Sequence, residues 1–301
     1  MVNKVVFIAS SSRSGSTIFE QLLSQDPRFF GLGEMRYYYT RMIRDNELCS
    51  CGKVGGECDF WSGNFKHVSE CGSIIDSQNK IDRIRYLYKY IFLKPANVDD
   101  PFINNILSTY NYAFEKSKVS NLIDSSKHLS YVFLFSKIHE NKVVWFIRKP
   151  KDVVISWLVP KRRPEITGKI TYMEKQSVIF STLEWVFTNM LFLIMFLVKG
   201  KAKVKPVFYE DFVNNPGGIY SEFLDFMGYK PNVELLSSLD SSKSFEVNEN
   251  HQVAGNPVRF NTGVIKINIG KSSNAVFKWY HSIFVRLFAD PLYYLIRVIT
   301  K

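Results

Sequence analysis

Residues 4–17 decide the fold, and they read KVVFIASSSRSGST. The first six residues form a nearly continuous run of apolar and β-branched side chains, the pattern of a strand buried on both faces of a parallel sheet. A loop of serines with one arginine and one glycine follows directly, and Thr17 to Leu23 shows the apolar spacing of a helix. A strand, a Ser/Gly-rich loop and a helix in this order favour anion binding by backbone N–H groups at the helix N-terminus.

Strand-like and helix-like segments alternate along the rest of the chain. Further strand-like runs lie at residues 121–123, 142–147 and 204–208, each bounded by polar, Gly or Pro residues. This alternation is typical of α/β proteins in which helices flank a central parallel sheet. We therefore expect a single α/β domain over residues 1–301 with a P-loop NTPase-like core. The expected helices are 17–23, 81–93, 101–117, 130–140, 151–158 and 170–198.

Three segments depart from this regular pattern. Residues 46–78 contain all four cysteines and are rich in Gly and Ser, which predicts an irregular inserted cap. Residues 237–270 lack clear periodicity, so we expect them to be rich in loops. Residues 277–301 form a basic amphipathic tail in which aromatic and aliphatic residues alternate with Lys and Arg. Such a tail suits a helix that covers the domain or one that lies in a membrane interface.

Composition excludes several classes of protein. With 301 residues, 46% of them hydrophobic and 22% charged, the chain has enough apolar material for a full core, which excludes disordered and fibrous chains. The longest unbroken apolar run, residues 190–198, is shorter than the roughly 18 residues that a spanning helix needs. The N-terminal apolar run is too short for a signal peptide, so we expect a cytoplasmic protein. The formal net charge of +11 favours an anionic ligand, a membrane surface or nucleic acid.

The first loop departs at two positions from the phosphate-binding pattern G-x-x-x-x-G-K-[ST]. Ser10 and Gly15 occupy the two glycine positions and Thr17 the hydroxyl position, but Ser16 stands where the lysine should be. The lysine that reaches a γ-phosphate is therefore missing. What remains, together with Arg13, suits a single phosphate or phosphosulfate group without requiring a nucleoside triphosphate and Mg²⁺. The alternative is a Ser-rich turn that only caps a helix.

A second basic element follows the predicted strand 142–147. Arg148 stands at the carboxyl end of that strand, and Ser156 comes eight residues later, a little over two helical turns. Pro150 suits the first turn of the intervening helix. Both side chains could face one ligand at the carboxyl edge of the sheet, where open α/β sheets bind their ligands.

The two elements together resemble the nucleotide-binding elements of sulfotransferases that use 3′-phosphoadenosine 5′-phosphosulfate (PAPS). The chain has the Arg-type first loop, similar to bacterial, carbohydrate and tyrosylprotein sulfotransferases. The resemblance runs from residue 5 to about residue 259. Similar segments occur in the expected order at 32–36 (LGEMR), 124–127 (DSSK), 209–212 (YEDF, followed by Pro216) and 251–259 (HQVAGNPVR).

This resemblance implies roles for individual residues in the donor site. The first loop would hold the 5′-phosphosulfate, and Arg148 with Ser156 would hold the 3′-phosphate. Gly255 and Asn256 would permit close backbone approach in a closing loop, with Arg259 covering the 3′-phosphate or the adenine. The first-loop residues concerned are Arg13, Ser14, Gly15, Ser16 and Thr17.

The resemblance also implies the catalytic groups. Glu34 would accept the proton of the acceptor hydroxyl, because the similar enzymes carry a catalytic Glu at this place. Lys127 would contact the oxygen that bridges phosphate and sulfate, and Arg13 would help to neutralise the charge that develops there. Glu34 could instead be a surface carboxylate paired with Arg36 or Arg41, and Lys127 could instead be a solvated lysine.

The implied activity is sulfuryl transfer from PAPS to a hydroxyl of a glycan, lipid-linked or peptide acceptor. The catalytic His of the cytosolic phenol and steroid enzymes has no counterpart, which makes a small phenol less favoured. Two alternatives stay open: a P-loop kinase or NTPase, and a non-catalytic basic module that binds membranes or nucleic acid. We expect no nucleic-acid partner, and the tail permits peripheral membrane contact. The sequence does not indicate an oligomeric state.

The cysteines have a pattern of their own. Cys49-Ser-Cys51-Gly52 and Cys58-Asp-Phe-Trp61 resemble a cysteine-rich insertion of bacterial sulfotransferases. A Cys-x-Cys with two further cysteines could hold Zn²⁺, but the spacing lacks the paired C-x₂-C knuckles of structural zinc sites. We therefore assign no metal, expect buried thiols or a local disulfide, and keep a metal site as the alternative. His251 is not assigned as the base, because a lone His is more often a hydrogen-bonded structural residue.

Overall fold

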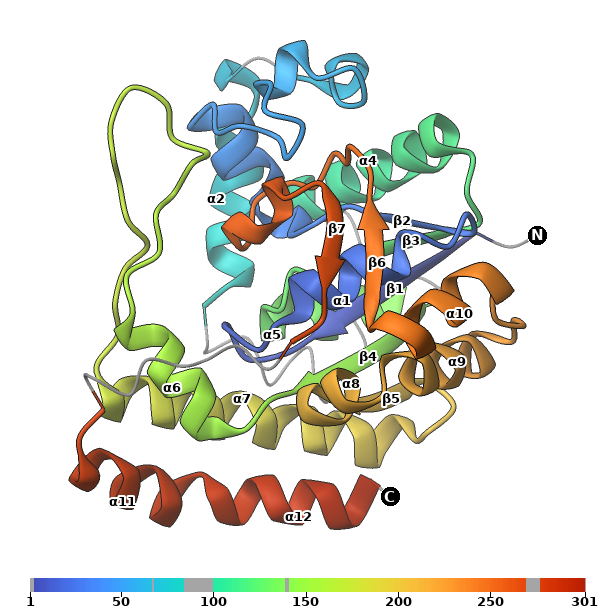
Figure 1. Ribbon diagram of the computed structural model, residues 1–301. Helices are drawn as coiled ribbons and strands as arrows, with labels where there is room; N and C mark the ends of the chain where they lie inside the picture. The colour runs from blue at the N-terminus through green and yellow to red at the C-terminus, as the bar shows by residue number, and fades with distance from the viewer. Residues whose placement is uncertain (1–2, 67, 84–99, 139–140, 269–276, 301) are drawn as a thin grey trace.

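Five parallel strands form the central sheet of the computed structural model, which describes residues 3–66, 68–83, 100–138, 141–268 and 277–300. The order is β2-β3-β1-β4-β5, so β1 lies at the centre (Figure 1). The predicted α/β architecture with a parallel sheet is confirmed. The strands are β1 (Lys4–Ala9), β2 (Phe29–Gly31), β3 (Asn121–Asp124), β4 (Asn141–Ile147) and β5 (Val204–Phe208). Of these five strands, only β2 was not predicted, because three residues are too few to show a period.

Alternation along the central strand divides the core into two layers. Val6 and Ile8 face a cluster formed with α1 (Ser16–Leu23), α8 (Tyr209–Asn214) and α9 (Pro216–Met227). Val5 and Phe7 face the opposite cluster, and the helices that contribute to it cover the other side of the sheet (Figure 1). These helices are α2 (Gly72–Ile81), α4 (Pro101–Ser117), α5 (Leu129–Ile138), α6 (Pro150–Leu158) and α7 (Val178–Lys199).

Helix α7 starts later than its apolar pattern predicted. Ser177 is its N-cap and accepts a hydrogen bond from the N–H of Phe180, whereas residues 170–177 are not helical. Tyr172 instead forms an antiparallel bridge with Arg162, which folds residues 161–173 back on themselves. By length and composition α7 could cross a membrane, although 56% of its most apolar window is buried inside the protein. This helix was not predicted as a candidate membrane span, because only unbroken apolar runs were counted.

The C-terminal tail forms two helices that lie in line outside α7 (Figure 1). They are α11 (Trp279–Phe288) and α12 (Asp290–Thr300). The Tyr293 hydroxyl donates to Glu210 at 2.8 Å, and the Arg297 guanidinium pairs with Asp211 at 3.0 Å. The tail is therefore anchored to α8, at the edge of the sheet formed by β5.

Irregular structure is concentrated on the side of the sheet where β2 lies. After β2 come a 3₁₀ turn at Met35–Tyr37 and a π-helix at Tyr38–Arg44. The cysteine-rich segment, residues 46–78, then contains three 3₁₀ turns before and up to the start of α2: Gly55–Glu57, Ser62–Asn64 and Val68–Glu70. The predicted helix at 81–93 is described only as far as residue 83, and Ile81 ends α2.

The segment expected to be rich in loops contains regular structure. It holds most of α10 (Val233–Ser242), the strands β6 (Ser244–Val247) and β7 (Gly263–Lys266), and a 3₁₀ turn at Pro257–Phe260. β6 and β7 pair antiparallel across a long connection, so local periodicity could not reveal them.

Candidate active site

The loop between β1 and α1 is shaped to hold an anion. Arg13 and Gly15 both have positive φ angles, 67° and 93°, and such turns direct successive backbone N–H groups to one side. A Cβ atom at position 15 would lie 2.7 Å from the ring of Tyr209, so only glycine fits there. Thr17 lies in the first turn of α1, whose positive dipole end points at the loop.

Four serine side chains of this loop are buried with unpaired hydroxyl groups. Ser10, Ser11, Ser14 and Ser16 are at most 3% exposed, and their hydroxyl oxygens have no hydrogen-bond partner among the residues that the structure describes. Leaving a buried polar group unpaired costs about 1–3 kcal/mol. Four such groups around one helix N-terminus fit a ligand rich in acceptor oxygens, such as a phosphosulfate.

The two arginines predicted to bind opposite ends of the nucleotide lie side by side. Arg148 donates from Nη1 to the carbonyl oxygen of Arg13 at 3.3 Å, and its guanidinium stacks 4.4 Å from the centre of the Tyr209 ring. The Arg13 guanidinium stacks on Trp157 at 4.7 Å. The Nε atoms of both arginines are buried and have no partner within the described parts of the chain. Ser156 is half-buried on α6, directly before Trp157.

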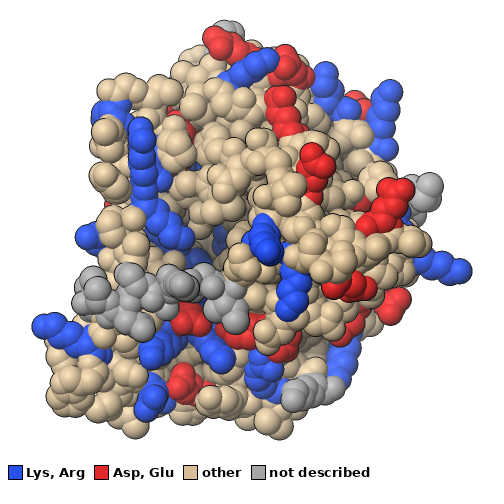
Figure 2. Space-filling view, in the orientation of Figure 1, with Lys and Arg blue, Asp and Glu red and all other residues tan. Residues whose placement is uncertain are grey.

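Lys161 is a further cation of this site that the sequence analysis missed. Burial and, after it, repulsion from Arg13, Arg148 and Lys127 together lower its pKa to about 8. Four cations therefore converge near the first loop. In the sequence, Lys161 looks like any member of a basic, solvated run. In Figure 2, most of the charged residues visible along the left side of the molecule are Lys and Arg.

The predicted base and the predicted catalytic lysine form an ion pair. Lys127 Nζ lies 2.7 Å from Glu34 Oε1, and the two side chains are 12% and 13% exposed. They follow β3 and β2, neighbouring strands whose carboxyl ends meet at one edge of the sheet. The alternative pairing of Glu34 is not observed in the described chain, because Arg36 pairs with Asp82 and Arg41 stacks on Tyr37.

A buried glutamate, also missed, connects the segments that carry this pair. Glu20 Oε1 accepts a hydrogen bond from the N–H of Gly33 at 2.6 Å, and Oε2 accepts one from the Ser125 hydroxyl at 2.6 Å. Burial raises the pKa of Glu20 to about 7. Because Gly33 precedes Glu34 and Ser125 lies two residues before Lys127, Glu20 positions both. On α1 it looked like an ordinary polar helix residue.

The Glu34–Lys127 pair lines two adjacent cavities. The smaller, about 140 Å³, also contains Arg13, Trp157, Gly255 and Asn256. The larger, about 260 Å³, extends away from these residues, and Ser12 and Tyr37 line both cavities. The pair therefore stands where the two cavities meet. The larger cavity is also lined by Ser10 and Ser11 of the first loop and by Asp82, Ser126, His128, Leu129, Ser130, Glu184, Phe187 and Thr188.

The loop near residue 255 lines the smaller cavity and is held by its own hydrogen bonds. Gly255 has a φ of 106° and lies against Glu34, with 3.3 Å between Oε1 and the place of a Cβ atom. The Asn256 side chain caps the turn at Val258. Arg259, however, has no exposed surface and donates to the carbonyl oxygens of Gly255 and Leu48. The Arg259 guanidinium is thus used inside the loop, and its contact with the 3′-phosphate or adenine stays a prediction.

Comparison with known proteins agrees with this geometry. Residues 3–288 match the family model described as a sulfotransferase domain. Similar solved structures include the sulfotransferase domain from the curacin biosynthetic pathway, with 14% identity, a TM-score of 0.52, and coverage of 95% of this chain and 97% of that one. The sulfotransferase domain of the Synechococcus PCC 7002 olefin synthase has 17% identity, a TM-score of 0.51, and coverage of 96% and 95%. No curated protein matches the chain in sequence.

Proposed function

Because the chain belongs to the sulfotransferase family, whose sulfuryl donor is PAPS, we propose that it transfers the sulfuryl group to a hydroxyl of a glycan, lipid-linked or peptide acceptor. The observation that carries this proposal is the convergence of four cations on one loop with four unpaired serine hydroxyls. PAPS carries negative charge at both its phosphosulfate and its 3′-phosphate. Cations and buried hydroxyls are the groups that bind such charge in a low-dielectric site.

On the donor side, residues of two loops divide the binding. The N–H groups of the first loop, its serines and Arg13 hold the phosphosulfate, while Arg148 and Ser156 hold the 3′-phosphate. Gly255 and Asn256 line the smaller cavity together with Trp157. Lys161 adds charge where Arg13 and Arg148 already stand. We expect bound nucleotide to separate these mutually repelling side chains with its own oxygens.

Glu34 and Lys127 act at the boundary between the two cavities. An acceptor hydroxyl in the larger cavity transfers its proton to a Glu34 carboxylate oxygen as it attacks sulfur in line. Lys127 and Arg13 stabilise the negative charge that develops on the phosphate oxygen as its bond to sulfur breaks. Glu20 accepts hydrogen bonds from Gly33 and Ser125 and so holds the segments that carry Glu34 and Lys127 next to each other.

Calorimetric titration with adenosine 3′,5′-bisphosphate (PAP) tests the donor site, with ATP-Mg²⁺ and adenosine 5′-phosphate as competitors. We expect PAP to bind more tightly than either. Tighter binding of ATP-Mg²⁺ would instead favour a P-loop kinase or NTPase. Incubation with PAPS and separate glycan, lipid-linked and peptide acceptors then identifies the acceptor class by PAP release, and no release with any hydroxyl acceptor would contradict the proposal.

We further propose that the protein is cytoplasmic and that α7, α11 and α12 contact a membrane surface. Large apolar side chains are exposed on all three helices, with Trp279 75%, Val298 76% and Phe180 60% exposed. The basic residues Lys151, Lys278 and Arg286 line a groove beside α11. Apolar side chains flanked by cations are typical of helices that lie at anionic lipid surfaces.

Flotation with vesicles that contain or lack anionic lipid tests this contact. We expect the wild-type protein to float with anionic vesicles, and a Trp279→Ser/Val298→Ser double variant to float less. Val233→Ser is a matched control, because Val233 is 78% exposed on α10, away from these helices. Protein that stays in the soluble fraction with every vesicle would refute the proposal.

A further inference from the structure

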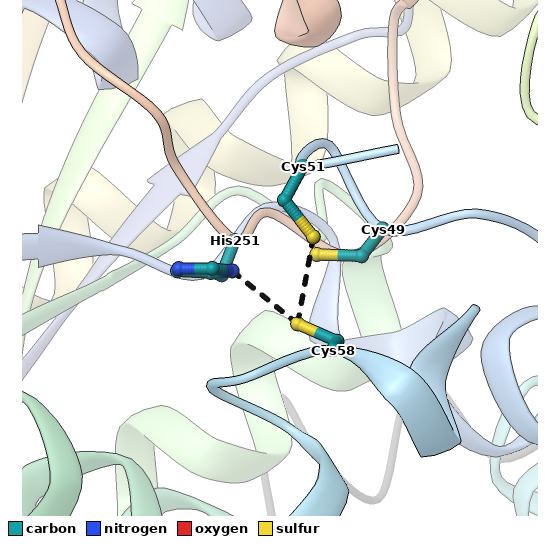
Figure 3. A group of neighbouring side chains, drawn as sticks. All are labelled: Cys49, Cys51, Cys58 and His251. Atoms are coloured by element: carbon teal, nitrogen blue, oxygen red, sulfur yellow. Dashed lines mark hydrogen bonds between the residues drawn. The ribbon is translucent and has the colours of Figure 1, made fainter. Parts of the chain in front are cut away.

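Three cysteines and one histidine converge beside the site already described. Cys49, Cys51 and Cys58 come from the cysteine-rich segment, and His251 comes from the loop that leads to Gly255, 193 positions after Cys58. Figure 3 shows their side chains pointing toward one another. One ligand atom from each residue lies within 4.8 Å of all the others. Cys71, the remaining cysteine, is not part of this group.

The spacing of these atoms fits a tetrahedral ion. Zn²⁺ bonds of about 2.3 Å to sulfur and about 2.05 Å to nitrogen place sulfur atoms about 3.8 Å apart and sulfur and nitrogen about 3.5 Å apart. The Cys51 and Cys58 sulfur atoms are 3.6 Å apart, and His251 Nδ1 is 3.3 Å from the Cys58 sulfur. These two distances lie within a few tenths of an ångström of the tetrahedral values, and the remaining distances in the group do not exceed 4.8 Å.

We propose that Cys49, Cys51, Cys58 and His251 bind one Zn²⁺ ion in a structural site. Three cysteines and one histidine supply all four ligands, which leaves no position for a substrate or water. The function proposed above does not use this site. No metal was expected because the cysteine spacing lacks paired C-x₂-C knuckles, and the fourth ligand, His251, is distant in the chain. The proposed ion replaces the expected local disulfide.

The surroundings of the group favour metal-binding thiolates and a fixed imidazole. Backbone N–H groups of Phe60 and Trp61 donate to the Cys58 sulfur, and that of Lys53 donates to the Cys51 sulfur. The His251 ring stacks on Phe60 with 5.4 Å between ring centres and a 14° angle. Trp61 Nε1 donates to the His251 carbonyl oxygen at 2.8 Å. Outer contacts of this kind orient metal ligands and stabilise their charged forms.

The ion would join the cysteine-rich segment to the loop that faces the nucleotide. The two already touch, because the N–H of Gln252 donates to the Ser50 hydroxyl at 2.7 Å. In the same loop, the carbonyl oxygen of Val253 accepts the N–H of Glu34 at 2.8 Å. A metal at His251 thus limits motion in the segment against which the predicted base rests. We expect its removal to weaken the binding of PAP.

Metal analysis of the full-length protein, purified under reducing conditions from zinc-supplemented medium, tests the proposal. We expect about one zinc per chain by mass spectrometry. Cys58→Ser and His251→Asn should lower this at least tenfold, whereas Cys71→Ser, the same chemical change outside the group, should not. His251→Cys supplies another zinc ligand and should restore binding.

A second measurement keeps the test independent of how well the variants fold. After removal of zinc with a chelator, Co²⁺ added to the wild-type protein should produce thiolate charge-transfer bands and the visible bands of a tetrahedral ion. Wild-type protein that contains no zinc and gives no such bands would overturn the proposal. Zinc that persists in both Cys58→Ser and His251→Asn would also overturn the proposal. A disulfide between two of the three cysteines, found in metal-free protein that still binds PAP, would overturn it as well. None of these results depends on sulfuryl transfer.

Discussion

The affinity for PAP should fall as the pH rises from 7 to 9, because Lys161 loses its proton in the free protein. Burial, followed by repulsion from Arg13, Arg148 and Lys127, lowers the pKa of Lys161 to about 8. Nucleotide phosphates neutralise the neighbouring cations, and so they should raise this pKa toward the ordinary lysine value of about 10.4. PAP binding therefore favours the protonated form of Lys161. The affinity for PAP falls once the pH exceeds the pKa that Lys161 has in the free protein.

The size of the effect follows from the two pKa values. At pH 7 nearly all Lys161 side chains carry a proton in the free protein, whereas at pH 9 roughly one in ten does. With a bound-state pKa near the ordinary value, affinity should drop roughly tenfold over this range, or about 1.4 kcal/mol. The phosphate itself contributes little, because its second pKa is about 6.

Calorimetry at pH 7, 8 and 9 in two buffers of different ionisation enthalpy measures both affinity and proton uptake. Uptake should approach roughly 0.9 proton per PAP bound at pH 9. Lys161→Arg is the matched control, since arginine keeps its charge throughout the range and should remove the pH dependence. The reasoning would fail if that variant kept the wild-type slope, or if wild-type binding took up no proton.

Three further predictions concern the donor site and the base. Glu34→Gln should keep PAP affinity but slow turnover at least roughly a hundredfold in an assay of PAP release, and unchanged turnover would remove Glu34 from the mechanism. Arg148→Ala should weaken PAP relative to adenosine 5′-phosphate by roughly 10- to 100-fold in calorimetry, the value of a charge-assisted hydrogen bond; equal weakening of both would contradict its role. Gly15→Ala should lower PAP affinity and the melting temperature together, because its Cβ meets Tyr209 at 2.7 Å in a left-handed conformation. Gly72→Ala, which has open space, serves as its control, and equal effects of the two would count against the steric argument.

Local patterns in the sequence determined the sheet and the first loop. β1, β4 and β5 are runs of apolar residues long enough to show burial on both faces, and each was predicted to within one residue. Arg13, Arg148, Glu34 and Lys127 each stand just beyond a strand. Because the carboxyl ends of parallel strands share one edge, strand order predicted this gathering for Arg13, Arg148 and Lys127. The place of Glu34 came from the family resemblance, since β2 was not predicted.

Tertiary structure alone decided which other groups join them. Lys161 reaches the site because residues 161–173 fold back on themselves, and Arg259 turns inward because carbonyl groups of two distant loops meet there. Glu20 acquires its role only when Gly33 and Ser125 pack against α1. His251 meets the three cysteines across most of the chain length. Such contacts join residues far apart in sequence, and no periodicity or spacing within a short segment records them.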